Sequence, residues 1–268
     1  LKTILSITCL PLAIFGLTQT AYAAKQIDSL MDAINDPNRN PSYTKRDKYR
    51  NPYETLSFFQ INPSMHVLEL SAGGGWYTEI LAPYLKAKGS LSVTHHNPDA
   101  GNYYMRSRNS FDEKVKSNPL FEGVKVITAD VPPSSPFAEP ETKDLVLTFR
   151  NLHNWLGRDS MQEVMLEAYK SLKPGGYFGV VEHRAPEGSS IEFMKKSGYV
   201  TQSLAIEKAL EVGFVLVDTS EINANPNDSA DHPKGVWTLP PSYRLKEKDR
   251  AKYESIGESD RMTLLFKK

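Results

Sequence analysis

Residues 67–78 bring together an apolar run, three consecutive glycines and the start of a helical pattern. The run 67–70 has the composition of a buried strand, and the apolar residues of 76–85 recur at helical spacing. A strand, a tight glycine turn and a helix form the first unit of a βαβ fold. Glycines at such a turn permit positive φ and let a nucleotide-like ligand approach the backbone. The alternative is a glycine turn that serves packing alone.

The spacing of the acid and the glycines separates two kinds of nucleotide site. A dinucleotide site requires G-x-G-x-x-G, and Thr78 stands where its third glycine is needed. The pattern E-x-G-x-G-x-G fits better, because Glu69, Gly73 and Gly75 match and only Ser71 departs from it. This stretch resembles motif I of the class I S-adenosylmethionine-dependent methyltransferases. The resemblance implies that these four residues bind S-adenosylmethionine, with the acid near its methionine amino group.

The later elements follow the same plan. Strand-like runs alternate with helical patterns, and a Lys-Pro-Gly-Gly turn at 173–176 precedes the fifth run, as is typical of the resembled fold. We expect a Rossmann-like, doubly wound α/β sheet of seven strands, mostly parallel with one antiparallel edge strand. The predicted strands are 67–70, 89–96, 124–130, 144–149, 177–182, 213–217 and 261–266.

Two further positions contact the cofactor in the resembled family. An acid at the end of the second strand accepts hydrogen bonds from both ribose hydroxyls, but here the aligned residue is His95, followed by His96. A neutral imidazole accepts only one such bond, so this departure predicts weaker binding or a different ligand. The alternative is that the two histidines only end a surface strand. Asp130 matches the position beside the adenine amino group, or else forms an Asx turn into Pro132.

The segment after the fourth strand resembles motif IV, whose residues face the methyl group and the acceptor. It contains Arg150, Asn151 and His153, which we expect to be catalytic. A histidine suits the role of general base when the acceptor begins protonated, so His153 is the first candidate. His183 and Arg184 follow the fifth strand and are candidate substrate residues. A histidine at a strand end also commonly serves as a structural hydrogen-bonding residue.

One segment precedes the predicted domain and another interrupts it. Residues 24–64 are expected to form an N-terminal helical cap, and residues 65–268 a methyltransferase-like domain with a long insertion at 223–260. Loops of this length are often functional. Tyr49 and Arg50 in the cap are further candidate substrate residues, although mixed charge there is also typical of a solvated helix face.

Residues 1–23 have the features of a secretory signal peptide. Lys2 precedes an apolar stretch at 4–17, and an A-x-A cleavage pattern ends at Ala23. The apolar stretch is too short to span a bilayer, so we expect no stable membrane span after cleavage. The single cysteine, Cys9, lies in this segment, which leaves no disulfide partners in the mature chain. The expected location is the periplasm or the exterior, and exported relatives of the resembled family share the run at 75–85.

Charge is balanced at 32 basic and 32 acidic residues, so we expect no nucleic-acid partner. No metal is expected either, because no H-E-x-x-H spacing occurs. The resemblance implies S-adenosylmethionine-dependent methyl transfer to an unknown, small-molecule acceptor. S-Adenosylmethionine is made in the cytoplasm, whereas the predicted signal peptide points to export. An exported ligand-binding protein without catalysis on a methyltransferase scaffold is therefore an alternative, and a metal-dependent hydrolase is a third.

Overall fold

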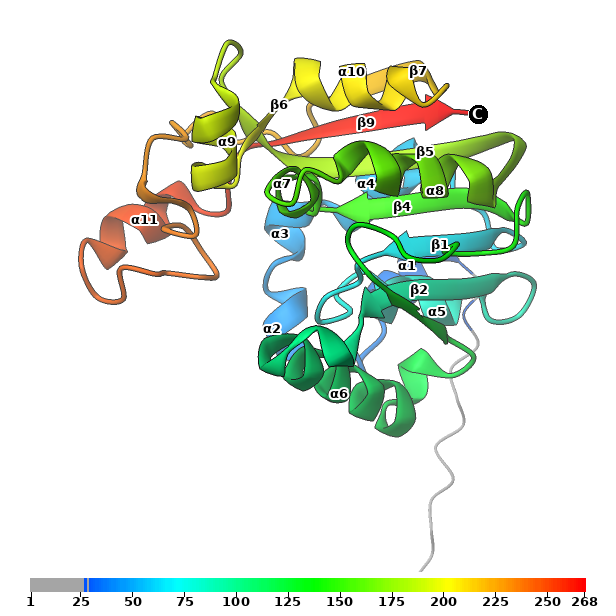
Figure 1. The fold of residues 1–268 in the computed structure, drawn as a ribbon. Helices are drawn as coiled ribbons and strands as arrows, with labels where there is room; N and C mark the ends of the chain where they lie inside the picture. Colours follow the sequence, from blue (N-terminus) through cyan, green and yellow to red (C-terminus); the bar gives the residue numbers. More distant parts are fainter. Residues whose placement is uncertain (1–26, 28) are drawn as a thin grey trace, which may run out of the picture.

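The structure, a computed structural model, describes residue 27 and residues 29–268. The predicted signal segment 1–23 lies outside the described residues. A central twisted sheet carries helices on both faces (Figure 1). Its strands follow the order β3-β2-β1-β4-β5-β9-β7, and β6 pairs with β5 beside this path. This order reverses between β1 and β4, which makes that pair the switch point of the sheet.

The strands confirm the predicted doubly wound, mostly parallel sheet. β1 to β5 run parallel to one another, and β9 pairs antiparallel with both β5 and β7 at one end of the sheet. β8 lies in the predicted insertion, outside this sheet. The strand bounds are β1 (His66–Leu70), β2 (Ser90–His96), β3 (Lys125–Ala129), β4 (Lys143–Phe149), β5 (Leu172–Ala185), β6 (Val200–Thr201), β7 (Val215–Ser220), β8 (Pro233–Val236) and β9 (Arg261–Lys267).

The helices cover two separate hydrophobic clusters, one on each face of the sheet. α7, α8, α9 and α10 pack over one face, while α1, α4 and α5 pack over the other. The helix bounds are α1 (Leu30–Ile34), α2 (Pro41–Thr44), α3 (Asp47–Arg50), α4 (Pro52–Phe58), α5 (Thr78–Leu85), α6 (Asn102–Ser117), α7 (Leu152–Leu156), α8 (Met161–Ser171), α9 (Ile191–Ser197), α10 (Gln202–Glu211) and α11 (Arg250–Ile256), with short 3-10 helices η1 (Pro98–Ala100) and η2 (Pro119–Phe121).

The central strands are buried on both faces, which explains their continuous apolar runs. In β1, Val67 packs in the cluster under α1 and α5, and Leu68 packs in the cluster under α7 and α8. Leu145 and Val146 of β4 divide in the same way. Because β1 to β5 are parallel, their carboxyl ends meet at one edge, where α2, α3 and α7 also lie (Figure 1).

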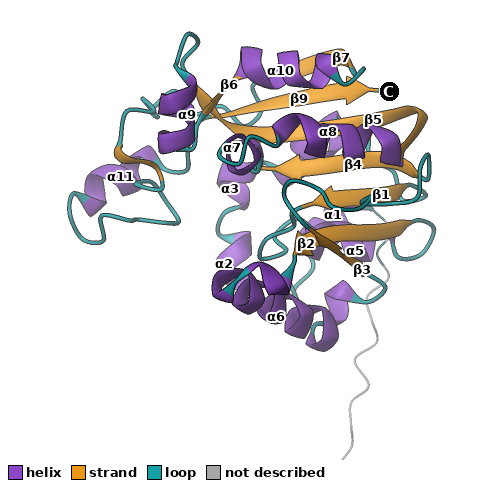
Figure 2. Cartoon of the chain, in the orientation of Figure 1, coloured by secondary structure: helices purple, strands orange, loops and turns teal. Residues whose placement is uncertain are grey.

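The insertion at 223–260 consists largely of loops around β8 and α11, and it extends past the sheet (Figure 2). Its first residue is tied to the sheet, because the Asn223 amide donates to the hydroxyls of Thr55 (3.0 Å) and Thr263 (2.9 Å). In the part of the chain that the structure describes, no helix has the length and apolar content needed to cross a membrane. The division into a cap and a domain at residue 65 stays a prediction.

Candidate functional site

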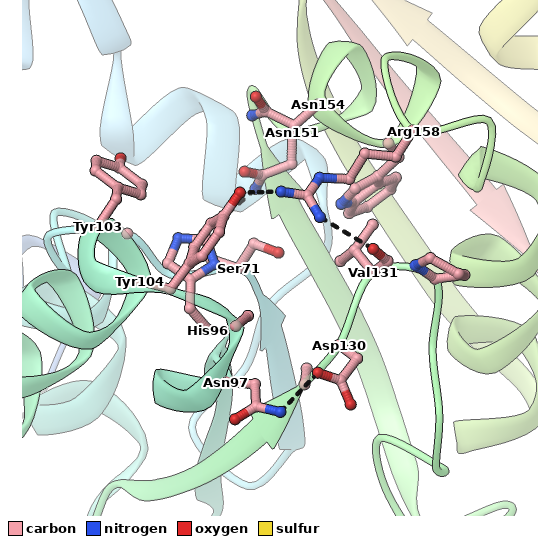
Figure 3. Close-up of a pocket in the computed structure, with 15 residues that line it drawn as sticks. Ser71, His96, Asn97, Tyr103, Tyr104, Asp130, Val131, Asn151, Asn154 and Arg158 are labelled. Atoms are coloured by element: carbon pink, nitrogen blue, oxygen red, sulfur yellow. Dashed lines mark hydrogen bonds between the residues drawn. The ribbon is translucent and has the colours of Figure 1, made fainter.

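A cavity of about 440 Å³ opens at the carboxyl ends of β1 to β4 (Figure 3). We call it the main cavity. The turn after β1 contributes Ser71 and Gly73, and the segment after β3 contributes Asp130. Aromatic walls come from α6, and Asn151 closes the side toward β4. Its volume lies in the range of small-molecule sites in proteins, and its position is where open α/β sheets bind ligands.

The glycine turn divides into residues that face the main cavity and residues that pack. Gly73 has φ +58°, and a Cβ there would meet only the carbonyl oxygen of Ser71, at 3.9 Å. The position is therefore open toward a ligand. A Cβ on Gly75 would instead come within 2.9 Å of the Phe121 ring. Gly75 therefore packs closely and does not line the main cavity, and its cofactor contact stays a prediction.

Glu69 lies beneath this turn and is only 2% exposed. The Thr78 hydroxyl donates to its carboxyl at 2.6 Å. Burial raises the pKa of Glu69 to about 8, although the bond from Thr78 opposes the shift. Glu69 lines a second, small cavity together with Arg150. Ser71 and Asn151 line both cavities, so the two adjoin.

The two histidines at the end of β2 have different surroundings, although their rings contact edge-on with centroids 5.0 Å apart. His95 is 2% exposed, and its Nε2 donates to the Gly73 carbonyl at 3.1 Å. Its ring stacks on Phe111, and burial lowers its pKa to about 4. His96 lines the main cavity instead and contacts the Tyr104 ring edge-on. His96 is thus the histidine that lines the main cavity, while His95 supports the glycine turn, and the ribose contact predicted for His95 stays a prediction.

Asp130 lies on the main cavity, as its alignment with the adenine position implied. It accepts hydrogen bonds from the Ser134 hydroxyl and from the Asn97 amide, the latter at 2.9 Å. These two bonds lower the pKa of Asp130 below its usual value. A charged carboxylate with fixed orientation therefore faces the cavity, and it can accept a hydrogen bond from a ligand amino group.

The outer wall of the main cavity was not found by sequence reasoning. Arg158 donates to the Tyr104 hydroxyl and to the Val131 carbonyl at 3.1 Å, which bridges α6 and the segment after β3 (Figure 3). Tyr103 on the same helix is 65% exposed. The available signal was the aromatic pair opening this polar helix. Only Phe111 marks its buried face.

Asn151 and Arg150 occupy the switch point. The Asn151 amide nitrogen donates to the Leu70 carbonyl and to the Thr148 hydroxyl, both at 3.1 Å. It thus joins the ends of β1 and β4. Arg150 has a left-handed backbone with φ +63°, and its N–H donates to the Val181 carbonyl at 2.7 Å. Its side chain lines the small cavity, where burial lowers its pKa to about 10.

His153 forms a buried pair with Glu182 at the end of β5. Its Nδ1 lies 3.0 Å from the Glu182 carboxylate, which also accepts from the backbone N–H groups of Leu152 (2.5 Å) and His183 (2.8 Å). Because an ionised carboxylate only accepts, Nδ1 carries the proton and Nε2 is left able to accept one. This is the geometry of an oriented general base. Sequence reasoning found His153 but missed Glu182, which it read as the end of a strand.

His153, Glu182 and His183 also bring possible metal-ligand atoms within 4.8 Å of one another. The Glu182 oxygens already accept backbone hydrogen bonds, and His183 Nδ1 lies 2.5 Å from the Ser259 hydroxyl. The groups thus satisfy one another, and the geometry favours a hydrogen-bonded pair over a metal centre. The predicted absence of a metal stays a prediction.

The remaining candidates lie on either side of His183. Arg184 donates to Asp260 (2.8 Å) and to Glu221 (2.7 Å), and these bonds raise its pKa. It ties β5 to the insertion, which differs from the substrate contact predicted for it. Arg50 is 1% exposed and lies 4.6 Å from the centre of the Trp76 ring. The Tyr49 ring packs near Gly257.

Comparisons with known proteins agree with this geometry. Residues 68–180 match the methyltransferase domain family. No curated protein matches the chain. A methyltransferase from Aquifex aeolicus, described as SAM dependent, has a TM-score of 0.56 at 16% identity over 85% of this chain and 93% of that one. Geranyl diphosphate methyltransferase in complex with SAM has a TM-score of 0.54 at 10% identity, covering 88% and 94%.

A third solved structure has the same fold and a different name. The [4+2]-cyclase SpnF has a TM-score of 0.57 at 14% identity over 89% of this chain and 91% of that one. At such identities the likeness establishes the fold, so the reaction must be argued from the site. The matched family spans the glycine turn, Asp130 and the Lys-Pro-Gly-Gly turn. The domain match, the strand order and the cavity together support a methyltransferase domain at residues 68–180 in a fold shared with S-adenosylmethionine-dependent methyltransferases.

Proposed function

We propose that this enzyme methylates a small molecule held between the main cavity and the His153–Glu182 pair, with His153 as the general base. The single observation that carries the proposal is this buried pair. His153 follows Asn151 by two residues, and Asn151 lines the main cavity. Gly73, His96 and Asp130 would hold the cofactor. When bound, S-adenosylmethionine supplies an electrophilic methyl group.

The residues of the chain divide the remaining work. Glu182 holds the imidazole so that Nε2 of His153 can take a proton from a hydroxyl or amine of the acceptor. The donors of Leu152 and His183 fix Glu182 in turn. Methyl transfer depends mainly on placing the two reactants in line, and a base held by buried hydrogen bonds contributes to that placement.

The test is transfer of a labelled methyl group from S-adenosylmethionine into a library of small hydroxyl, amine and carboxyl compounds. We expect His153→Gln to lower the rate about 10²-fold or more, while the affinity for S-adenosylhomocysteine stays the same. His66→Gln is the control, because His66 is exposed at the opposite end of β1. Equal rates for wild type and His153→Gln would reject this base. Cofactor binding with no transfer to any compound would favour a ligand-binding protein.

We also propose that residues 1–23 direct export and are removed, which would place the enzyme among exported relatives of this superfamily. The support is the leader pattern ending at Ala23. Mass spectrometry of the chain recovered from cell fractions tests this directly. We expect an N-terminus near Ala24 in the periplasmic or extracellular fraction. Retention of residues 1–23 on protein from the cytoplasm would contradict it.

A further inference from the structure

Arg150, which lines the small cavity, lies within electrostatic range of three further arginine side chains, and we call these four residues the arginine cluster. Arg46 and Arg50 come from the α3 region, Arg150 from the end of β4, and Arg261 from the start of β9. Glu258 accepts from Arg46 (2.6 Å), Arg50 (3.3 Å) and Arg261 (3.3 Å). Among the described residues, it is the only carboxylate that pairs with any of the four.

The cluster contains donors that the protein does not satisfy. Both terminal nitrogens of Arg50 are buried without a hydrogen-bond partner, and so is Nη2 of Arg46. Arg150 forms no ion pair within the described part of the chain. Unpaired buried donors and like charges are costly, so such an arrangement is complete only when an anion binds.

The charges of the neighbouring groups also favour a bound anion. Burial, followed by the charge of Arg150, lowers the pKa of Arg50 well below its usual value. The arginines hold the pKa of Glu258 at about 2 against the opposing effect of burial, so this carboxylate stays ionised yet cannot balance four guanidinium groups. Glu69 also lies nearby, but with a pKa of about 8 it is mostly neutral at pH 7. Glu182 is engaged by His153 and by backbone donors.

The position of the cluster connects it to both parts of the site. Arg150 lines the small cavity, which adjoins the main cavity at Ser71 and Asn151. On the other side, the charges of His153 and of three cluster members act on His183, whose pKa is lowered first by burial and then by these neighbours. An anion at the cluster would therefore lie within reach of both the cofactor cavity and the general base.

We propose that the arginine cluster binds the anionic group, a carboxylate or a phosphate, of the methyl acceptor. Planar guanidinium groups bind both kinds of anion through paired hydrogen bonds. Glu258 keeps the side chains ordered when the anion is absent. The assignment of the anion to the acceptor rests on the proposed function, whereas the anion site itself does not.

Isothermal titration with inorganic phosphate tests the site in three states of the protein. The protein is titrated alone, with saturating S-adenosylhomocysteine, and with saturating 5′-methylthioadenosine, which lacks the amino-acid part of the cofactor. We expect phosphate to bind in the millimolar range or tighter, with the same affinity in all three states. Phosphate binding that is blocked by S-adenosylhomocysteine but not by methylthioadenosine would overturn the proposal, because the cluster would then hold the carboxylate of the cofactor.

Variants locate the phosphate. Arg150→Met removes a guanidinium that has no ion pair among the described residues, and Arg46→Gln changes a side chain that is 20% exposed. We expect each to weaken phosphate binding at least tenfold. Without phosphate, the Tm of Arg150→Met should equal or exceed that of wild type, because a like charge is removed. Arg250→Met is the control, since it changes the net charge equally at an exposed position outside the cluster.

Unchanged phosphate affinity in both Arg150→Met and Arg46→Gln would overturn the anion site, and so would an equal loss in Arg250→Met. Circular dichroism establishes that each variant is folded. Failure of the proposed function has a different signature. If S-adenosylhomocysteine does not bind but phosphate still does, and cluster variants abolish phosphate binding, the methyltransferase function is rejected and the anion site stands.

Discussion

The proposed site has two halves. The cofactor half is the main cavity, and the acceptor half comprises the His153–Glu182 pair and the arginine cluster with Glu258. The two halves are built in different ways. The main cavity is open, and its charged groups, Asp130 and Arg158, are hydrogen-bonded within the protein. The region around Glu258 is buried, and several guanidinium nitrogens there have no partner. The first half is suited to a nucleoside, which is recognised by shape and a few hydrogen bonds. The second is suited to a ligand that supplies negative charge.

This difference shows that separate parts of the fold bind the proposed cofactor and select the proposed acceptor. The cofactor half draws on the turn after β1 and on the ends of β2 and β3, which the fold places at one edge in any such protein. The acceptor half adds the N-terminal helices and the insertion, which the sheet does not position by itself. Changes in the first half should therefore alter cofactor affinity, and changes in the second should alter turnover and anion binding.

The largest effect is expected from Glu182→Gln on the acceptor half. The new amide would turn an N–H group toward the donors of Leu152, His153 or His183. We expect a loss of about 2–5 kcal/mol in the free energy of unfolding and a large loss of methyl transfer. Urea denaturation measures the change in the free energy of unfolding. An unchanged unfolding midpoint would show that these donors find other partners.

Glu69→Gln probes the boundary between the two halves. The pKa of this acid is raised to about 8 in the fold, so wild type loses stability as pH rises from its unfolded value near 4.5 through 8. One pKa unit corresponds to about 1.4 kcal/mol, so the advantage of the variant should grow by about 3 kcal/mol between pH 5 and pH 8. Thermal melts of both proteins across this range test it. Parallel pH profiles would contradict the raised pKa.

Gly73→Asp tests the cofactor half alone. The new side chain would enter the main cavity from a backbone with φ +58°, which disfavours any residue with a Cβ. We expect affinity for S-adenosylhomocysteine to fall about 100-fold or more, with phosphate binding unchanged. Gly123→Asp is the matched control, because Gly123 has φ +84°, has nothing within 4 Å of its Cβ position and lies away from the main cavity. Equal losses in both variants would point to backbone strain alone.

The smallest effect is expected from His96→Asp. A carboxylate offers two acceptor oxygens to a ribose where an imidazole offers one, so affinity for S-adenosylhomocysteine should rise about tenfold. His95→Asp should weaken it, because the donor to the Gly73 carbonyl is lost. The opposite pattern, measured by titration calorimetry, would show that His95 is the residue that faces the ribose.

The sequence signals for the cofactor half are local, and the cofactor contacts that they predict stay predictions. Glu69 and Gly73 lie four residues apart, and Asp130 follows directly from the end of β3. At the end of β2, the alignment selected His95, whereas the adjacent His96 lines the main cavity. The two rings contact each other, and their different surroundings come from packing against Phe111 and Tyr104. Gly75 likewise fits the motif, but its environment depends on Phe121, which a motif cannot place.

The acceptor half was not predictable in the same way. Arg46 and Glu258 are 212 residues apart in sequence, and neither has a pattern around it that points to the other. Arg50 was singled out, but its burial depends on the insertion and on Trp76. Glu182 looked like an ordinary strand residue, because its role appears only when α7 is placed against β5. Such contacts follow from tertiary packing.

Hydrogen exchange with and without S-adenosylhomocysteine tests most directly that the cofactor and the anion occupy different halves. We predict that the ligand protects backbone amides at 71–75, 96–104 and 130–132, and leaves amides at 46–50 and 258–261 unchanged. Added phosphate should then protect the latter segments. Protection by S-adenosylhomocysteine that is centred on 46–50 and 258–261, with none at 130–132, would contradict the account.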